Sequence, residues 1–320
     1  MVSIDHILKA RERIGQLTRV TPLRYSKSLS DITAASIFLK LENEQVTGSF
    51  KVRGALNRLM TLTHEQIERG VITASTGNHG LGVAFAARQL GIKARVVFPT
   101  EASSEKLQKM KDAGVEVIQE VDYTEIEPHA RELARNQDLT YVSPYNDSEI
   151  IAGAGTVGLE ILEQADSIDT IVVPIGGGGL ISGIATAIKA RLPEIQIIGV
   201  QSEVSPEVYE SWRAGRWIEA EESTSLAQGL MGGVEADSIT LDIIQKLVDS
   251  IVLVRESSIL EAIRHLYELE SLIIEGAGAA SVAALLEMGP TISGKNVVAV
   301  VSGGNISEAT VKTLIRKEVR

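Results

Sequence analysis

The segment TIVVPIGGGGLISG, from Thr170 to Gly183, contains the pattern that decides the fold of this chain. Residues 170–175 are mostly β-branched, as in a buried strand, and the residues from Leu180 onward have the apolar spacing of a helix. Four consecutive glycines, Gly176 to Gly179, separate the two, although a tight turn needs only one or two. Main-chain N–H groups at a helix start can enclose a phosphate. The segment therefore predicts a strand–loop–helix unit with a phosphate-binding loop.

The same alternation of strand and helix continues along nearly the whole chain. Repeated βα units imply right-handed crossovers and parallel sheets that are covered by helices. The predicted strands are 71–75, 94–99, 115–120, 139–143, 170–175, 195–200, 250–254 and 296–302. The predicted helices include 80–91, 103–113, 148–165, 180–191, 256–271 and 306–318. A break near 143–147 is the expected crossing between two lobes, and ligands of such open sheets bind beyond the carboxyl ends of the strands.

The composition argues against several classes of protein. The 320 residues are 44% hydrophobic and 23% charged, which is ordinary for a globular protein with one large or two smaller domains. The net charge of −11, without any run of basic residues, argues against nucleic-acid binding. No apolar stretch reaches the roughly 18 residues of a membrane span. The N-terminus is typical of an amphipathic helix rather than a signal peptide, and there is no cysteine, so we expect a cytoplasmic protein.

A second segment, GSFKVRGA at 48–55, places Lys51 between an aromatic and a β-branched residue at the start of a helical pattern. The helix dipole disfavours a cation there, and simple solvation of the side chain is the ordinary explanation. STGNHG at 75–80 follows a predicted strand, and such residues either bind a carboxylate or merely cap a helix. SGGN at 302–305 follows the last predicted strand. Together, these segments suit a phosphorylated aldehyde cofactor that a lysine holds as a Schiff base.

One segment matches a nucleotide-binding motif only formally. GAGTVG at 153–158 has the glycine spacing of a dinucleotide fingerprint, but it follows a helical pattern rather than a strand. We therefore do not expect a dinucleotide site there. The five histidines are widely separated in the sequence, so we expect no metal site either.

In order and spacing, these segments resemble those of the fold-type II pyridoxal phosphate (PLP) enzymes, in particular the serine/threonine dehydratase and serine racemase branch. The resemblance is carried by RVTPL (19–23), TGSFKVRGA (47–55), ASTGNHG (74–80), GTVGLEI (155–161), PIGGGGLISG (174–183), IIEGAGA (273–279) and VVSGGN (300–305). It implies an α/β fold like that of the tryptophan synthase β subunit, with two lobes that each contain a largely parallel sheet. We expect residues 1–66 and 147–320 to form a large cofactor-binding domain and residues 67–146 a small substrate-loop domain.

The resemblance also implies roles for single residues. Lys51 would hold the cofactor, the N–H groups of the glycine loop would bind its phosphate, and Asn78 would bond to its 3′-oxygen. The cofactor-binding residues that it implies are Phe50, Lys51, Asn78, Gly176, Gly177, Gly178, Gly179, Leu180 and Ser302. The residues that it places around the substrate carboxylate are Ser75, Thr76, Asn78 and His79.

The implied activity is the PLP-dependent dehydration and deamination of a β-hydroxy-L-amino acid, L-threonine or L-serine, to a 2-oxo acid and ammonia. Lys51 would be the catalytic base, and Thr76 is the second catalytic candidate. Ser302 would face the pyridine nitrogen, and a neutral hydroxyl there favours elimination over transamination. Three alternatives stay open: an amino-acid racemase, a dehydratase for a bulkier substrate such as phenylserine or a hydroxyectoine-derived compound, and a nucleotide-binding oxidoreductase or non-catalytic binding module.

The sequence departs from the family pattern at several positions. Thr76 stands where racemases carry a serine that acts as their second proton carrier, and Gln228 replaces an aspartate near the substrate side chain. Gln201, Ser205 and Glu207 stand at the family's divalent-metal ligands, but Gln201 replaces a carboxylate, so we predict no metal. We also expect a homodimer or higher homo-oligomer, and no regulatory domain after the final helix.

Overall fold

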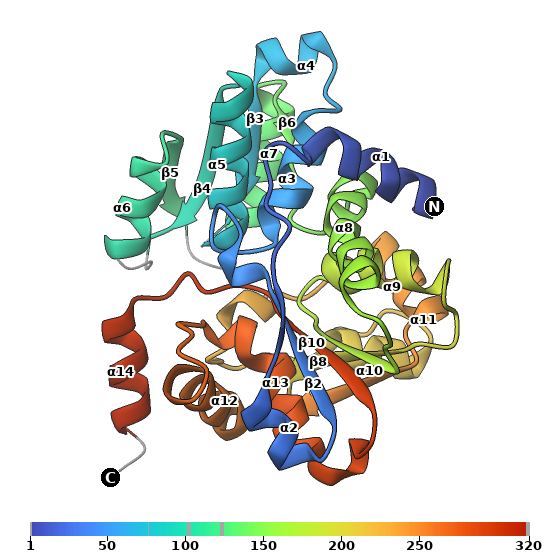
Figure 1. Ribbon diagram of the computed structural model, residues 1–320. Helices are drawn as coiled ribbons and strands as arrows, with labels where there is room; N and C mark the ends of the chain where they lie inside the picture. The colour runs from blue at the N-terminus through green and yellow to red at the C-terminus, as the bar shows by residue number, and fades with distance from the viewer. Residues whose placement is uncertain (1, 76, 101–103, 122–124, 318–320) are drawn as a thin grey trace.

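The computed structural model describes residues 2–75, 77–100, 104–121 and 125–317. Within these ranges the strands form two sheets, which lie in an upper and a lower body in Figure 1. The larger sheet has six strands in the order β1-β2-β10-β7-β8-β9, and the smaller has four in the order β5-β4-β3-β6. Neighbouring strands are parallel throughout, except that β1 is antiparallel to β2.

The elements alternate along the chain as expected for βα units. The strands are β1 Leu23–Tyr25, β2 Ser36–Leu41, β3 Val71–Ala74, β4 Ala94–Pro99, β5 Glu116–Val121, β6 Thr140–Tyr141, β7 Thr170–Pro174, β8 Gln196–Ser202, β9 Ser250–Val254 and β10 Asn296–Val301. The α-helices are α1 Ile4–Ile14, α2 Lys27–Thr33, α3 Lys51–Leu59, α4 His64–Arg69, α5 Asn78–Leu90, α6 Ser104–Asp112, α7 Ile126–Asn136, α8 Ser148–Gln164, α9 Gly179–Lys189, α10 Glu207–Ala214, α11 Ile239–Leu247, α12 Glu256–Glu268, α13 Gly276–Met288 and α14 Glu308–Lys317. Short 3-10 helices are η1 Glu42–Glu44, η3 Gln228–Leu230 and η4 Gly289–Ile292.

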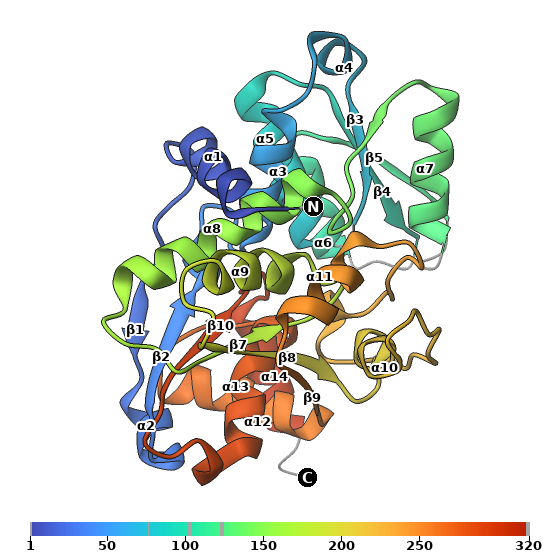
Figure 2. The same ribbon diagram turned by 90° about the vertical axis from the view of Figure 1, so that its right-hand side faces the viewer.

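The six-stranded sheet is buried on both faces, which explains why its strands are nearly continuous apolar runs. In β10, Val297, Ala299 and Val301 pack on one face with α2, α12 and α13, while Val298 and Val300 pack on the other with α8, α9 and α11. Figure 2 shows the two layers of helices on either side of this sheet. Burial of both faces leaves the carboxyl edge of the strands for polar loops.

The four-stranded sheet is covered in the same way by helices that flank it in sequence. Val71 of β3 packs with α3 and α5, whereas its neighbour Ile72 packs with α7. This sheet lies wholly within residues 67–146, but α3, from outside that range, packs against α5. The division of the chain at 66/67 and 146/147 stays a prediction.

The α/β class and the parallel sheets are as the sequence predicts. Two neighbouring strands at one edge of the large sheet were not among the predicted strands. β1 has only three residues, too few to give a strand signal, and it pairs in the antiparallel sense. In β2, Lys40 interrupts the short apolar run. GAGTVG at 153–158 lies within α8 and packs against neighbouring helices, so it is not a strand-to-helix loop. Among the described residues, no helix combines the length and apolarity needed to cross a bilayer.

Candidate active site

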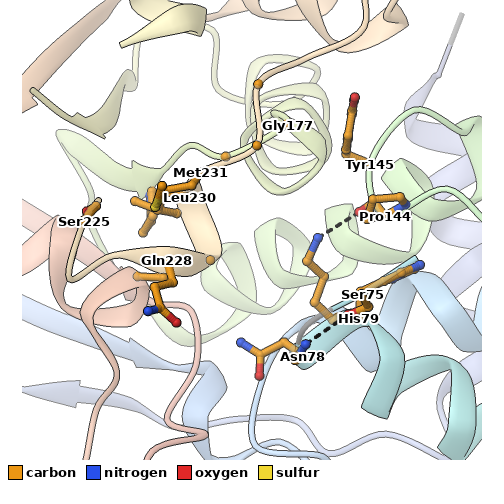
Figure 3. A pocket seen from close by; sticks show the side chains of 18 of the residues that line it. Ser75, Asn78, His79, Pro144, Tyr145, Gly177, Ser225, Gln228, Leu230 and Met231 are labelled. Atoms are coloured by element: carbon orange, nitrogen blue, oxygen red, sulfur yellow. Dashed lines mark hydrogen bonds between the residues drawn. The ribbon is translucent and has the colours of Figure 1, made fainter. Parts of the chain in front are cut away.

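A cleft of about 1790 Å³ opens where the carboxyl ends of strands from both sheets meet. It is lined by the loops after β3, β7 and β10, by the start of α3 and by the segment between α10 and α11. In Figure 3, Ser75 and His79 lie on one side of the cleft, and Ser225, Gln228 and Met231 lie on the other. The predicted site segments, which are up to 250 residues apart, are therefore brought into one cavity.

Lys51 is the first residue of α3 and lines this cleft. Its Nζ donates a hydrogen bond to the carbonyl oxygen of Pro144 at 2.8 Å and lies 5.3 Å from the centroid of the Phe50 ring. The backbone N–H of Phe50 donates to the carbonyl of Ser302 at 3.1 Å, which ties the start of α3 to the end of β10. Burial lowers the pKa of Lys51 to about 8, so far more of this amine is neutral near physiological pH than in a free lysine.

Buried charges anchor the helix that begins at Lys51. Arg53, in the first turn of α3, donates to Glu42 at 2.7 Å and to Glu160 of α8 at 2.6 Å, and all three side chains are buried. Lys40 of β2 adds a bond to Glu160 at 2.6 Å. Although burial opposes ionisation, the charges of Arg53 and Lys40 lower the pKa of Glu160. A paired and hydrogen-bonded network of this kind fixes α3 relative to the large sheet.

The glycine loop, residues 176–179, forms another wall of the cleft. Gly178 has φ +85°, a left-handed conformation that favours glycine, and a Cβ there would lie 2.7 Å from Ile244 Cδ1. α9 begins at Gly179, and no side chain caps its N-terminus. Thr240 holds the loop from behind by donating to the carbonyl of Gly177 at 2.8 Å. The first N–H groups of α9 therefore remain for a ligand in the cleft.

Ser75 directly follows β3 and precedes α5. Ser75 Oγ accepts hydrogen bonds from the backbone N–H groups of Gly77, at 3.1 Å, and Gly80, at 2.9 Å. Its hydroxyl is thus engaged in holding the start of α5, although the residue also lines the cleft. Thr76 is outside the described residues.

His79 is a buried, neutral imidazole. Burial, with the nearby charge of Lys51, lowers its pKa to about 3, and Nε2 lies 3.2 Å from the carbonyl oxygen of Val142. A carbonyl only accepts, so Nε2 carries the proton and Nδ1 is a lone-pair acceptor. Nδ1 is buried without a hydrogen-bond partner among the described residues. In this protonation state His79 cannot donate to a carboxylate from Nδ1.

Asn78 is held at both ends of its side-chain amide. Its Nδ2 donates to Glu275 Oε1 at 2.5 Å, and its Oδ1 accepts from Asn305 Nδ2 at 2.6 Å. Ser302 is buried at the end of β10, where its Oγ lies 3.4 Å from the carbonyl of Ala277. All four polar side chains, those of Asn78, Glu275, Asn305 and Ser302, line the cleft.

The residues at the family's metal positions are engaged in protein hydrogen bonds. Gln201 Oε1 accepts from the N–H of Tyr209 at 2.7 Å, Glu207 Oε1 accepts from the N–H of Val234 at 2.6 Å, and Ser205 bonds to Glu222. In the part of the chain that the structure describes, no three acidic or histidine side chains are grouped as metal ligands.

Comparison with known proteins shows the family of this chain. Residues 14–303 match the family model described as "Pyridoxal-phosphate dependent enzyme". The chain belongs to this family. It is 41% identical over 318 residues to the L-threonine ammonia-lyase of Thermotoga maritima, covering 99% of this chain and 79% of that one. It is 43% identical over 320 residues to the L-threonine dehydratase catabolic TdcB of Staphylococcus aureus, covering 98% and 92%. Maize serine racemase superposes with a TM-score of 0.92 at 33% identity, covering 99% and 98%.

The cleft fits the cofactor of this PLP-dependent family. A phosphorylated aldehyde needs an amine that can be neutral and a set of N–H donors for the phosphate. Lys51, with its lowered pKa, would supply the amine, and the uncapped N-terminus of α9, directly after Gly178, would supply the donors. The predictions of the family, the fold type and the cofactor are confirmed.

Sequence reasoning missed several residues of this PLP site. Pro144 and Tyr145 lie in the segment that was expected only to cross between lobes, yet the first accepts from Lys51 and the second lies against Gly177. Glu275 and Asn305 belong to the quoted motifs at 273–279 and 300–305, and their polarity was the only available signal. Their contact with Asn78 depends on loops from three distant parts of the chain.

Proposed function

We propose that this PLP-dependent enzyme is an ammonia-lyase that eliminates water from a β-hydroxy-L-amino acid, after which hydrolysis of the product takes up one water and gives a 2-oxo acid and ammonia. Its proposed substrates are L-threonine and L-serine. The observation that carries the proposal is a lysine of lowered pKa, Lys51, which faces an uncapped glycine loop across one cleft. The similarity to proteins named threonine ammonia-lyase and threonine dehydratase supports the reaction class. When bound, PLP supplies an electron-accepting ring that stabilises negative charge on the substrate α-carbon.

The chain's own residues have separate tasks in this proposal. Lys51 holds the cofactor and then moves the α-proton as a general base, which its lowered pKa favours. The glycine loop and the start of α9, from Gly176 to Leu180, bind the phosphate, and Phe50 packs against the ring. Asn78 and Ser302 bond to the ring's oxygen and nitrogen. Ser75 and the N–H groups at the start of α5, with Thr76, bind the substrate carboxylate, while His79 supports this loop through Val142.

A product assay tests the proposal. PLP-loaded protein is incubated with L-threonine or L-serine, and the 2-oxo acid, ammonia and D-amino acid are measured together. We expect equal amounts of 2-oxo acid and ammonia, formed much faster than D-amino acid, and no product from Lys51→Ala. Faster accumulation of D-serine than of pyruvate would instead assign a racemase. The structural similarity of this chain to maize serine racemase is the reason to measure D-serine. The cytoplasmic location and homo-oligomeric state stay predictions.

A further inference from the structure

We propose that Asn305 and Glu275 are positioning residues that fix the side-chain amide of Asn78 with an N–H group toward the cofactor. This inference rests on the proposed function, in which Asn78 donates to the 3′-oxygen of PLP. Neither residue is expected to touch the reacting atoms. Their role is to determine whether the nitrogen or the oxygen of the Asn78 amide faces the cofactor.

The three side chains form one hydrogen-bonded chain with defined ends. Asn305 Nδ2 donates to the carbonyl oxygen of Thr47 at 2.8 Å and to Asn78 Oδ1 at 2.6 Å. Asn78 Nδ2 then donates to Glu275 Oε1 at 2.5 Å. A backbone carbonyl and an ionised carboxylate can only accept hydrogen bonds. Because both ends of the chain are acceptors, only one orientation of the two amides satisfies every contact.

The packing around Asn305 supports this fixed orientation. Its Oδ1 faces Gly48, where a Cβ would lie only 2.6 Å away, so the amide has little room to move. The N–H of Gly304 also donates to the carbonyl of Gly48 at 2.9 Å, which holds the loop after β10 against the loop before α3. Glu275 is the N-cap residue of α13 and is likewise held by a helix start. Asn305 is therefore held by the contacts of its loop with the loop before α3, and Glu275 lies at the start of α13.

The chemistry of an amide explains why orientation matters. An amide nitrogen has two N–H groups, and the bond to Glu275 uses one of those on Asn78. The other can donate to a ligand in the cleft that Asn78 lines. A rotation of 180° would present Oδ1 instead, and an amide oxygen repels an acceptor oxygen on the cofactor. Loss of Asn305 or Glu275 removes one of the two contacts that favour this orientation. The flipped amide is then populated more often, so cofactor affinity falls and the electronic environment of the ring changes.

A double-mutant cycle tests this inference by PLP binding, without any substrate. Cofactor-free Asn305→Ala, Asn78→Ala and the double variant are titrated with PLP, and the absorbance of the bound cofactor is recorded. We expect Asn305→Ala to weaken binding about threefold to tenfold and to shift the absorbance. In the Asn78→Ala background, the same change should have no further effect on either measurement. Asn136→Ala, on the exposed end of α7, is a matched control that should bind like the unmodified protein.

The outcomes separate this inference from the proposed function. If Asn305→Ala weakens PLP binding equally with and without Asn78, it does not act through Asn78, and the inference is wrong. Unchanged binding and absorbance in Asn305→Ala would overturn it too. If the unmodified protein does not bind PLP, the proposed function itself fails. Thermal unfolding of the cofactor-free proteins checks the fold. If Asn305→Ala does not fold, the same double-mutant cycle is carried out with Glu275→Gln instead, because this change removes the carboxylate at the other end of the hydrogen-bonded chain.

Discussion

At the scale of single residues, the proposed function depends on Lys51. Its place at a helix start drew attention to it, but solvation was the ordinary explanation there. Its role as the cofactor lysine was predicted only from the other segments and the family resemblance. The sequence could not predict the carbonyl of Pro144 that accepts from Nζ at 2.8 Å, because that contact depends on how the two lobes meet. Likewise, the sequence identified His79 as a polar site residue, but only the contact with Val142 shows which nitrogen carries the proton.

The lowered pKa of Lys51 gives a prediction about pH. A free lysine titrates at 10.5, whereas burial lowers the pKa of Lys51 to about 8. Because the neutral amine attacks the aldehyde, the rate of PLP capture by the cofactor-free protein should level off above about pH 8. Below that pH the rate should fall about tenfold per unit. Stopped-flow absorbance measures the rate of PLP capture at each pH. The reaction of PLP with N-acetyl-lysine in the same buffers is the control, because it shows the effect of the titration of PLP itself. A profile that keeps rising in parallel with N-acetyl-lysine would contradict it.

At the scale of elements, the strand and helix pattern was predictable where both faces of a strand are buried. β10 was predicted at 296–302 and is found at Asn296–Val301, since its five apolar residues alternate between two covered faces. β1 was missed because a three-residue edge strand has no such pattern. The glycine loop was predictable because four glycines before a helix have few purely structural explanations.

The glycine loop gives the second prediction. Gly178→Asp adds a side chain at φ +85° whose Cβ would lie 2.7 Å from Ile244 Cδ1, so the loop must shift, and it brings a negative charge beside the proposed phosphate site. PLP affinity should therefore fall by at least about tenfold. Equilibrium titration of the cofactor-free protein measures the loss, and circular dichroism checks the fold. Gly215→Asp is the matched control, since this glycine has φ +66° at the end of α10 and no atom within 4 Å of an added Cβ. PLP affinity equal to that of the control would show that the glycines serve only chain geometry.

At the scale of the whole molecule, the cleft joins two lobes through contacts that sequence spacing could not reveal. Arg131 of α7, beside the small sheet, pairs with Glu235 in the segment before α11, 104 residues later. Glu235 also bonds to Asn146, and its N–H donates to the hydroxyl of Tyr145 at 3.1 Å. The Tyr145 ring lies against Gly177 of the glycine loop. This set of contacts connects the small lobe to the phosphate-binding wall.

The third prediction concerns this connection. Glu235→Ala removes a partly exposed pair worth about 1 kcal/mol or less, so amide hydrogen exchange in residues 231–238 should become up to about fivefold faster. Mass spectrometry of exchanged peptides measures the change. Asp138→Ala breaks the exposed pair with Arg69, which lies within the small lobe, and should leave exchange at 231–238 unaltered. Equal exchange at 231–238 in both variants would show that Glu235 does not hold the lobes together.

The central claim is that Lys51 holds the cofactor in the cleft between the two lobes. Lys40 is the structural alternative, since it is also a buried lysine, but its Nζ donates to Thr21, Glu160 and Gln164, which occupy its three N–H groups. The direct measurement is borohydride reduction of the PLP-loaded protein, followed by digestion and mass spectrometry. The account predicts a phosphopyridoxyl group on the peptide that contains Lys51, and none in Lys51→Ala. A label on Lys40, or on any other lysine, would contradict it.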